Sequence, residues 1–216
     1  AGAEAVRAVS LLPALLGQHR GFYYSNSRGR YLGGNMSGES LTARKPKVVS
    51  QISLGDRLAR GEFKFVYVFS MNPVLTLPDS GRVVEGLKRG DVFLVVHETH
   101  ITETCDLADV VLPAPTYLEK DDVVLCDSHP YVRKAFKAVE PEGLSRDEGV
   151  VMRELARRVG VEEPWVYADP WDEAENVLKD AFADGGFRDY MEGAQLRLRL
   201  RPRDQYQTPT GRIEFA

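Results

Sequence analysis

Two dense runs of aromatic and β-branched residues constrain the fold more than any other feature of the sequence. Residues 63–70 (FKFVYVFS) and 92–97 (VFLVVH) are predicted as strands buried on both faces. Between them, Val83 and Leu87 lie at helical spacing before Gly90. A strand, a helix and a strand in this order form a βαβ unit with a right-handed crossover. The sequence therefore predicts an α/β fold in three layers, with a mostly parallel sheet and helices on both faces.

The rest of the chain continues this alternation of strands and helices. Short strands are predicted at residues 109–112 and 123–126, and the alternating residues 196–201 (LRLRLR) are typical of an edge strand blunted by charge. Ser145 and Glu148 have the spacing of a capping box, which predicts a helix that ends at Gly160.

A second C-terminal helix is predicted to begin at Asp169-Pro170 and to end at Gly185-Gly186, with Phe182 on its apolar side.

The expected organisation is a partial lead-in helix and binding loop at 1–60, an α/β lobe at 61–195 and a linker toward a further domain at 196–216. The lead-in helix covers residues 3–16, although Pro13 must kink or shorten it. Residues 17–46, rich in Gly, Ser, Asn and Arg, are interpreted as the binding loop.

Composition excludes several classes of partner. The 216 residues carry 28 Lys and Arg against 32 Asp and Glu, a net charge of −4, so no global field favours nucleic acid or an anionic membrane. No apolar run is long enough to predict membrane insertion. The two cysteines, Cys105 and Cys126, fit no metal motif and are expected to be buried thiols, which mildly favours the cytoplasm.

Polar side chains follow the two central strands, where open parallel sheets bind ligands. Asn72 comes after the first strand and residues 97–104 (HETHITET) after the second. Neither ordinary nucleotide fingerprint is present, because no GxGxxG follows a strand and residues 33–40 carry Glu39 where a phosphate loop needs lysine. Structural roles stay open for these side chains, as solvated acids or turn residues. The spacing of His97, Glu98 and His100 does not fit a metal site.

A longer motif makes the resemblance specific. Residues 102–114 (TETCDLADVVLPA), followed by Glu119-Lys120, resemble a segment of the molybdopterin oxidoreductases related to dimethyl sulfoxide reductase, formate dehydrogenase and periplasmic nitrate reductase. Flanking features follow the order of that family: Asn72-Pro73, and the stretches at 12–21, 141–148 and 208–214. Departures include Glu98 where the family most often has Asp, and residues 121–124 where it has Gly-Thr-x-x-Asn.

The resemblance implies a cofactor-binding role. In this family, two molybdopterin guanine dinucleotides hold one molybdenum or tungsten, and this portion of the chain grips one of them. The implied cofactor-binding residues are Asn72, His97, Glu98, Lys120 and Asp147, with Thr102 and Thr104 as weaker candidates. Asp109 can either cap a strand edge or bind, and Asp147 has an alternative role at a helix start. The resemblance places no catalytic residue and no metal ligand in this chain.

The same resemblance implies that the chain is an interior piece of a larger oxidoreductase and is inactive alone. The segments that hold a [4Fe–4S] cluster and the metal ligand are expected outside it, so its partners are the remaining domains and candidate electron-transfer subunits. The alternative is a structural module of the same fold, as in the iron–sulfur subunit of respiratory complex I. Retention of Asn72, Glu98, Lys120 and Asp147 favours the cofactor-binding role. A generic NAD or ATP domain lacks its glycine fingerprint.

Overall fold

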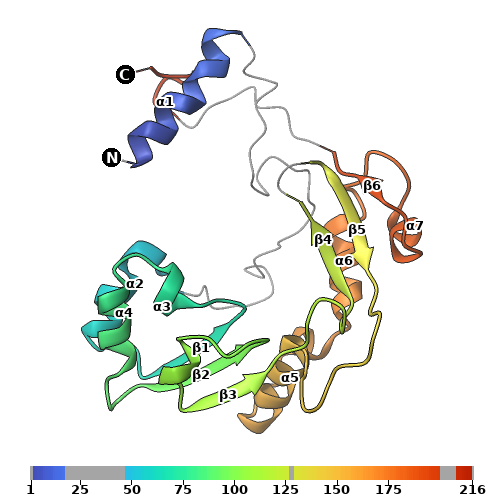
Figure 1. Ribbon diagram of the computed structural model, residues 1–216. Helices are drawn as coiled ribbons and strands as arrows, with labels where there is room; N and C mark the ends of the chain where they lie inside the picture. The colour runs from blue at the N-terminus through green and yellow to red at the C-terminus, as the bar shows by residue number, and fades with distance from the viewer. Residues whose placement is uncertain (1, 18–46, 127–128, 200–207, 216) are drawn as a thin grey trace. The chain divides into compact units, whose positions relative to one another are not determined.

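The computed structural model describes residues 2–17, 47–126, 129–199 and 208–215 (Figure 1). Two compact units divide the chain, one formed by residues 38–122 and 135–168, and the other by residues 1–37, 123–134 and 169–216. This division differs from the single lobe expected at 61–195. The physical reason is that the second unit has a hydrophobic core of its own.

The first unit is built on a parallel sheet of strand order β1-β2-β3. The strands are β1 (Phe65–Phe69), β2 (Phe93–Glu98) and β3 (Val110–Pro113). Each neighbouring pair is parallel, with Val66 opposite Leu94 and Val95 opposite Val110. The chain crosses from β1 to β2 through α3 (Pro73–Thr76) and α4 (Ser80–Leu87). The predicted βαβ unit is therefore confirmed.

Helices flank this sheet on two sides, which confirms the three layers (Figure 1). On one face, α2 (Gln51–Ala59) and α4 pack on β1 and β2, around a core of Leu58, Leu77, Val83, Leu87, Leu94, Val96 and Cys105. On the other face lies α5 (Glu148–Arg158), whose Val151 and Leu155 line a cavity of about 580 Å³ over Tyr67, Val95 and Val111. In the described part of this unit, Cys105–Leu107 and Pro164–Tyr167 form short 3₁₀ turns.

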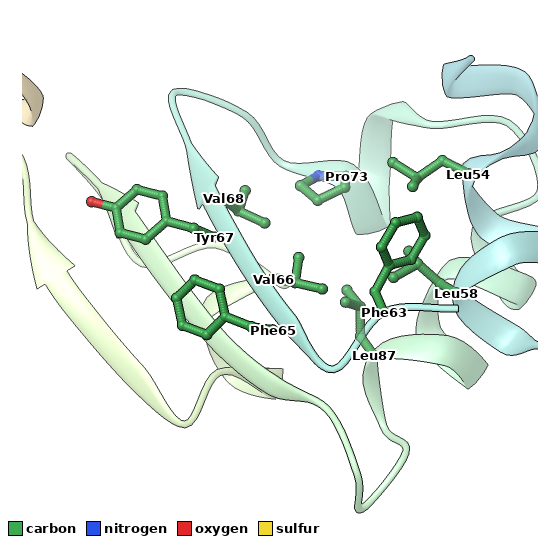
Figure 2. A pocket seen from close by; sticks show the side chains of 9 residues that line it. All are labelled: Leu54, Leu58, Phe63, Phe65, Val66, Tyr67, Val68, Pro73 and Leu87. Carbon is green, nitrogen blue, oxygen red and sulfur yellow. The ribbon is translucent and has the colours of Figure 1, made fainter. Parts of the chain in front are cut away.

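Strand β1 is buried less than its sequence predicts. Phe65 is 54% exposed and Phe69 56% exposed, and Phe93 on the central strand β2 is also exposed, because the cavity under α5 leaves this face of the sheet partly uncovered. A cavity of about 250 Å³ lies between β1 and α2. Figure 2 shows Val66 and Val68 directed toward the leucines of the helices, and the Tyr67 hydroxyl directed away from them. Its lining carries no charged side chain, so this cavity belongs to the core and not to a polar site.

The start of α5 differs from the capping box expected at Ser145. The Ser145 hydroxyl donates to the backbone oxygen of Glu142, so it does not cap the helix. Asp147 is the N-cap instead, and its carboxylate accepts from the backbone N–H of Gly149 at 2.8 Å. An N-cap side chain satisfies one of the free N–H groups of the first helical turn.

The second unit contains a small sheet of strand order β4-β5-β6. Its strands are β4 (Asp122–Leu125), β5 (Tyr131–Ala135) and β6 (Leu196–Arg197), and β5 pairs antiparallel with β6. Helices α6 (Pro170–Leu178) and α7 (Phe187–Met191) pack with it around the buried Tyr190. The helix expected to reach Gly185 ends at Leu178, because Phe182 pairs as a β-bridge with Leu198.

Helix α1 (Gly2–Leu15) contains Pro13, as expected for the lead-in segment. The predicted binding loop at 17–46, apart from Gly17, lies outside the described residues, as do the last two residues, 200 and 201, of the alternating segment at 196–201. Within the described ranges, no helix is long and apolar enough to cross a membrane.

The contact between α2 and α4 depends on the absence of a side chain at Gly86. A Cβ there would overlap Leu58 Cβ and lie 2.5 Å from the Leu58 carbonyl carbon. We expect Gly86→Ala to lower the free energy of unfolding by about 1–3 kcal/mol through overpacking. The matched control is Gly81→Ala in the same helix, where a Cβ meets no atom within 4 Å. Urea unfolding of both variants checks this, and equal effects would contradict it.

Candidate functional site

The carboxyl ends of the parallel strands carry most of the predicted site residues. Asn72 follows β1, Glu98 ends β2, and Thr102 and Thr104 lie in the segment after it. Because the strands are parallel, these ends lie at one edge of the sheet. The segment after β3 adds Lys120, and the start of α5 adds Asp147, all within one compact unit.

Asn72 is held by the segment that follows β2. Its amide nitrogen donates to Glu103 Oε2 at 2.7 Å, and its amide oxygen accepts from the Thr104 hydroxyl at 2.7 Å. The fully buried Thr104 hydroxyl in turn accepts from the backbone N–H of Val74 at 3.3 Å. The hydrogen bond from Asn72 lowers the pKa of Glu103. This network fixes the turn after β1 against the turn after β2.

His97 is completely buried within the protein. Its Nε2 lies 2.9 Å from the backbone oxygen of Arg146 and 3.2 Å from that of Pro113. Since carbonyl oxygens only accept, Nε2 carries the hydrogen in the neutral ring, and Nδ1 accepts from the Tyr67 hydroxyl at 2.9 Å. Burial raises the pKa of that hydroxyl, as does the nearby Glu148 carboxylate. His97 therefore joins the sheet edge to the backbone just before Asp147.

Lys120 meets two carboxylates at the start of α5. Its ammonium lies 3.0 Å from Glu148 Oε2 and 3.8 Å from Asp147 Oδ2. Glu148 Oε1 accepts from the Ser70 hydroxyl at 3.2 Å, which brings in the end of β1. Burial lowers the pKa of Lys120, but the hydrogen bond and charge of Glu148, together with the charges of Asp147 and Asp122, outweigh it, so the net shift is upward. For Glu148, burial raises the pKa, yet backbone and Lys120 hydrogen bonds leave it lowered.

The side chains of Glu98 and Thr102 make only local hydrogen bonds in the described structure. Glu98 Oε1 accepts from the backbone N–H and the hydroxyl of Thr99, at 2.8 and 3.1 Å. The Thr102 hydroxyl lies 3.4 Å from Cys105 Sγ, and its backbone oxygen accepts from Cys105 N–H. The second carboxylate oxygen of Glu98 has no hydrogen-bond partner among the described residues, which leaves an acceptor available at the edge.

Asp109 does not join the other candidates. It precedes β3, and its carboxylate accepts from the backbone N–H of Leu94 at 2.7 Å, at the start of β2. Both positions are at the amino ends of the strands, opposite the edge that carries Asn72 and Glu98. The structure therefore assigns Asp109 the strand-capping role and removes it from the candidate site.

Sequence reasoning missed three participants: Ser70, Tyr67 and Glu148. Glu148 was considered only as a helix-start residue, because the sequence does not reveal that its carboxylate reaches the end of β1. Ser70 has a left-handed backbone, with φ of 50°, which is uncommon for a residue other than glycine. A positive φ directly after a predicted strand is the kind of local strain that marks functional edges, but no sequence signal reports it.

Nothing in the described part of the chain forms a cluster of three or more histidine, cysteine, aspartate or glutamate side chains suited to a metal ion. Cys105 is buried, as expected, whereas Cys126 is partly exposed. The His97 ring is hydrogen-bonded to the Tyr67 hydroxyl and to backbone oxygens.

The first unit is therefore an open parallel α/β domain, and polar side chains suited to binding a ligand lie at the carboxyl ends of its strands. Residues 1–158 match the family described as molybdopterin oxidoreductase. The chain belongs to this family. A solved relative in fold is acetylene hydratase from Pelobacter acetylenicus, with a TM-score of 0.60 and 23% identity, covering 77% of this chain and 24% of that one.

Curated relatives are oxidoreductases. A probable oxidoreductase of Bacillus subtilis, YoaE, is 30% identical over 74% of this chain and 25% of its own length. The F420-dependent formate dehydrogenase subunit alpha of Methanocaldococcus jannaschii is 38% identical over 48% of this chain and 15% of its own. The periplasmic nitrate reductase of Desulfovibrio desulfuricans is 32% identical over 62% and 18%. The chain thus spans a quarter or less of these relatives.

Removal of the His97 hydrogen bonds should destabilise the sheet edge. In His97→Phe, the backbone oxygen of Arg146 and the Tyr67 hydroxyl lose their partner in a buried place, which we expect to cost about 1–3 kcal/mol. His100→Phe is the matched control, because His100 is exposed and we expect a change within about 0.5 kcal/mol. Chemical denaturation followed by circular dichroism measures both, and an equally stable His97→Phe would contradict the structural role.

Acid should destabilise the fold through its bonded carboxylates. Hydrogen bonds lower the pKa of Glu103 and Glu119, and Lys64 and Arg89 lower that of Asp91 to about 2. A folded-state pKa below the unfolded one gives stability that is present above the ordinary carboxyl pKa and is lost as the pH falls through the folded value. We expect the free energy of unfolding to fall between about pH 5 and pH 2.

Urea titrations at a series of pH values measure this slope. Glu119→Gln should make the fall of stability with pH shallower. The Glu119 carboxylate accepts from the backbone N–H groups of Thr116 and Glu142, and glutamine has no carboxyl group to protonate. A free energy of unfolding that stays constant or rises on acidification would contradict a stabilising role for these carboxylates.

Proposed function

We propose that the carboxyl edge of the β1-β2-β3 sheet holds the guanosine end of a molybdopterin guanine dinucleotide, in a molybdenum or tungsten oxidoreductase. The observation that carries this proposal is the convergence of Asn72, Glu98, Lys120 and Asp147 at one edge of one compact unit. Membership of the molybdopterin oxidoreductase family supports a pterin cofactor. The guanine form and the placement of its nucleoside are our inference from the donors and acceptors at this edge.

The acceptors at this edge fit a nucleoside. Guanine presents N–H groups and ribose presents hydroxyls, and both need acceptors such as carboxylates. Glu98 retains one oxygen without a described partner, and Asp147 Oδ2 faces Lys120 at 3.8 Å after Oδ1 has capped α5. In the proposed site, these two acids accept hydrogen bonds from the guanosine. Asn72, locked between Glu103 and Thr104, presents its remaining amide hydrogen at the turn after β1.

His97 and Thr104 are positioning residues in this proposal. Both are fully buried, and their hydrogen bonds run to Arg146, Tyr67, Asn72 and Val74. They hold the side chains that would touch the cofactor. Thr102 remains a candidate contact, since its hydroxyl has only the weak partner Cys105.

The bound cofactor would supply the redox chemistry, and this chain would supply binding and orientation. The metal ligand and any [4Fe–4S] cluster would come from other parts of the enzyme, as would contacts to electron-transfer subunits. A purely structural module has no physical need for a convergent set of carboxylates, an ammonium and an amide. That set is the reason to prefer a cofactor-binding role over a structural one.

Titration calorimetry of the chain with GMP and GDP tests the proposal. We expect millimolar binding, about −4 kcal/mol, with adenine nucleotides weaker. The informative variant is Glu98→Gln combined with Asp147→Ser, because serine retains an N-cap acceptor while the charge is removed. We expect the affinity to fall at least about tenfold through the loss of two charge-assisted hydrogen bonds.

The matched control is Asp169→Ser, which makes the same change at the N-cap of α6, where Asp169 accepts from the Trp171 N–H at 2.8 Å. It should leave binding unchanged. Absence of guanine-selective binding by the folded wild-type chain, or equal loss in the control, would reject the proposed site.

A further inference from the structure

Lys120 is compensated by two acids before any ligand arrives. The Lys120 and Glu148 side chains are only 22% and 18% exposed, and their charged atoms lie 3.0 Å apart. Asp147, 41% exposed, adds a second carboxylate at 3.8 Å. Two carboxylates paired with one ammonium leave this corner negative, and the charge of Asp122 adds to the negative field at Lys120. Solvent screens partly buried charges less than exposed ones, so an incoming anion meets that charge directly.

Glu148 cannot easily turn away from Lys120, because both of its oxygens are bonded. Oε2 accepts from the Lys120 ammonium, while Oε1 accepts from the Ser70 hydroxyl at 3.2 Å. The carboxylate thus joins the first turn of α5 to the end of β1 and to the segment after β3. A residue that served only the helix dipole would need neither of these partners.

We propose that Glu148 is a specificity-determining residue, which neutralises Lys120 so that this corner accepts the hydrogen-bond donors of a nucleoside and rejects phosphate. The identity of the nucleoside rests on the proposed function, but the suppression of anion binding at Lys120 does not. A lysine near a nucleotide is usually interpreted as a phosphate ligand, because its ammonium is a point charge suited to phosphate. Here the ammonium pairs with Glu148 at 3.0 Å and lies 3.8 Å from Asp147, so it holds these carboxylates in place.

In this proposal, Asp147 and Lys120 have different roles at the sheet edge. Asp147 Oδ1 is occupied by the Gly149 N–H, which leaves Oδ2 as the acceptor that faces an incoming donor. Lys120 lies 3.8 Å from that acceptor, and its own positive charge is already compensated by Glu148. A phosphate group would have to displace Glu148 from Lys120 and break the bond to Ser70 as well.

The experiment compares wild type with Glu148→Gln, which keeps the shape and removes the charge. The probes are inorganic pyrophosphate, followed by NMR of the Lys120 side chain, and guanosine and GDP, followed by calorimetry. Glu154→Gln is the matched control, since Glu154 lies on the same helix and its ion pair with Arg146 at 3.1 Å does not involve Lys120. The double variant Lys120→Met, Glu148→Gln shows whether any effect passes through Lys120.

In Glu148→Gln, we expect pyrophosphate to bind at Lys120 about five- to tenfold more tightly than in wild type, as for the loss of one nearby, partly screened charge. The ratio of GDP to guanosine affinity should rise by a similar factor. Both gains should be absent in Glu154→Gln and should disappear in the double variant. Phosphate contacts elsewhere on the chain cancel in this ratio.

Unchanged pyrophosphate binding at Lys120 in the folded Glu148→Gln protein would overturn the inference, as would a gain that persists without Lys120. If guanosine and GDP bind to none of the proteins, the proposed function fails, and the pyrophosphate comparison alone decides the role of Glu148. If GDP binds but its ratio to guanosine is the same in Glu148→Gln as in wild type, the proposed function stands and the specificity role of Glu148 is rejected.

Discussion

The buried imidazole of His97 is the interaction on which the sheet edge depends. It bonds the Tyr67 hydroxyl on β1 and the backbone oxygens of Pro113 and Arg146, so one ring connects two strands with the segment that leads into α5. The Arg146 N–H also donates to the Pro113 oxygen at 3.2 Å. With both backbone groups of Arg146 held, Asp147 and Glu148 are presented to the edge in one orientation. Their ion pairs with Lys120 follow from that placement.

Sequence periodicity predicted the elements that carry the site but not the contacts that orient it. The three strands, the crossover helix α4 and α5 were all expected, because apolar spacing reports which stretches are buried. Parallel topology then places residues after each strand at one edge. Asp109 shows the limit of this reasoning. It belongs to the same motif as Thr104, yet β3 begins directly after it, so it lies at the amino ends of the strands.

Long-range partners account for the remaining differences. Ser145 and Asp147 are both suitable N-cap residues. Asp147 is the N-cap because the Ser145 hydroxyl donates to the Glu142 backbone oxygen and the Arg146 N–H is bonded to Pro113 on β3. Phe182 fits a helical stripe, but its pairing with Leu198 draws it out of the helix. In both cases the local pattern allowed two solutions, and a contact distant in sequence selected one.

The polar side chains at the carboxyl edge of the sheet are largely bonded to one another before a ligand binds. Asn72 already uses its amide oxygen and one amide hydrogen within the protein, and Lys120 is already neutralised, so a ligand meets a largely prearranged surface. Such a surface gives up little conformational entropy on binding and can hold a nucleotide in one pose. A cofactor that carries its own reactive group needs binding and fixed orientation from its protein, which is the role proposed for this edge.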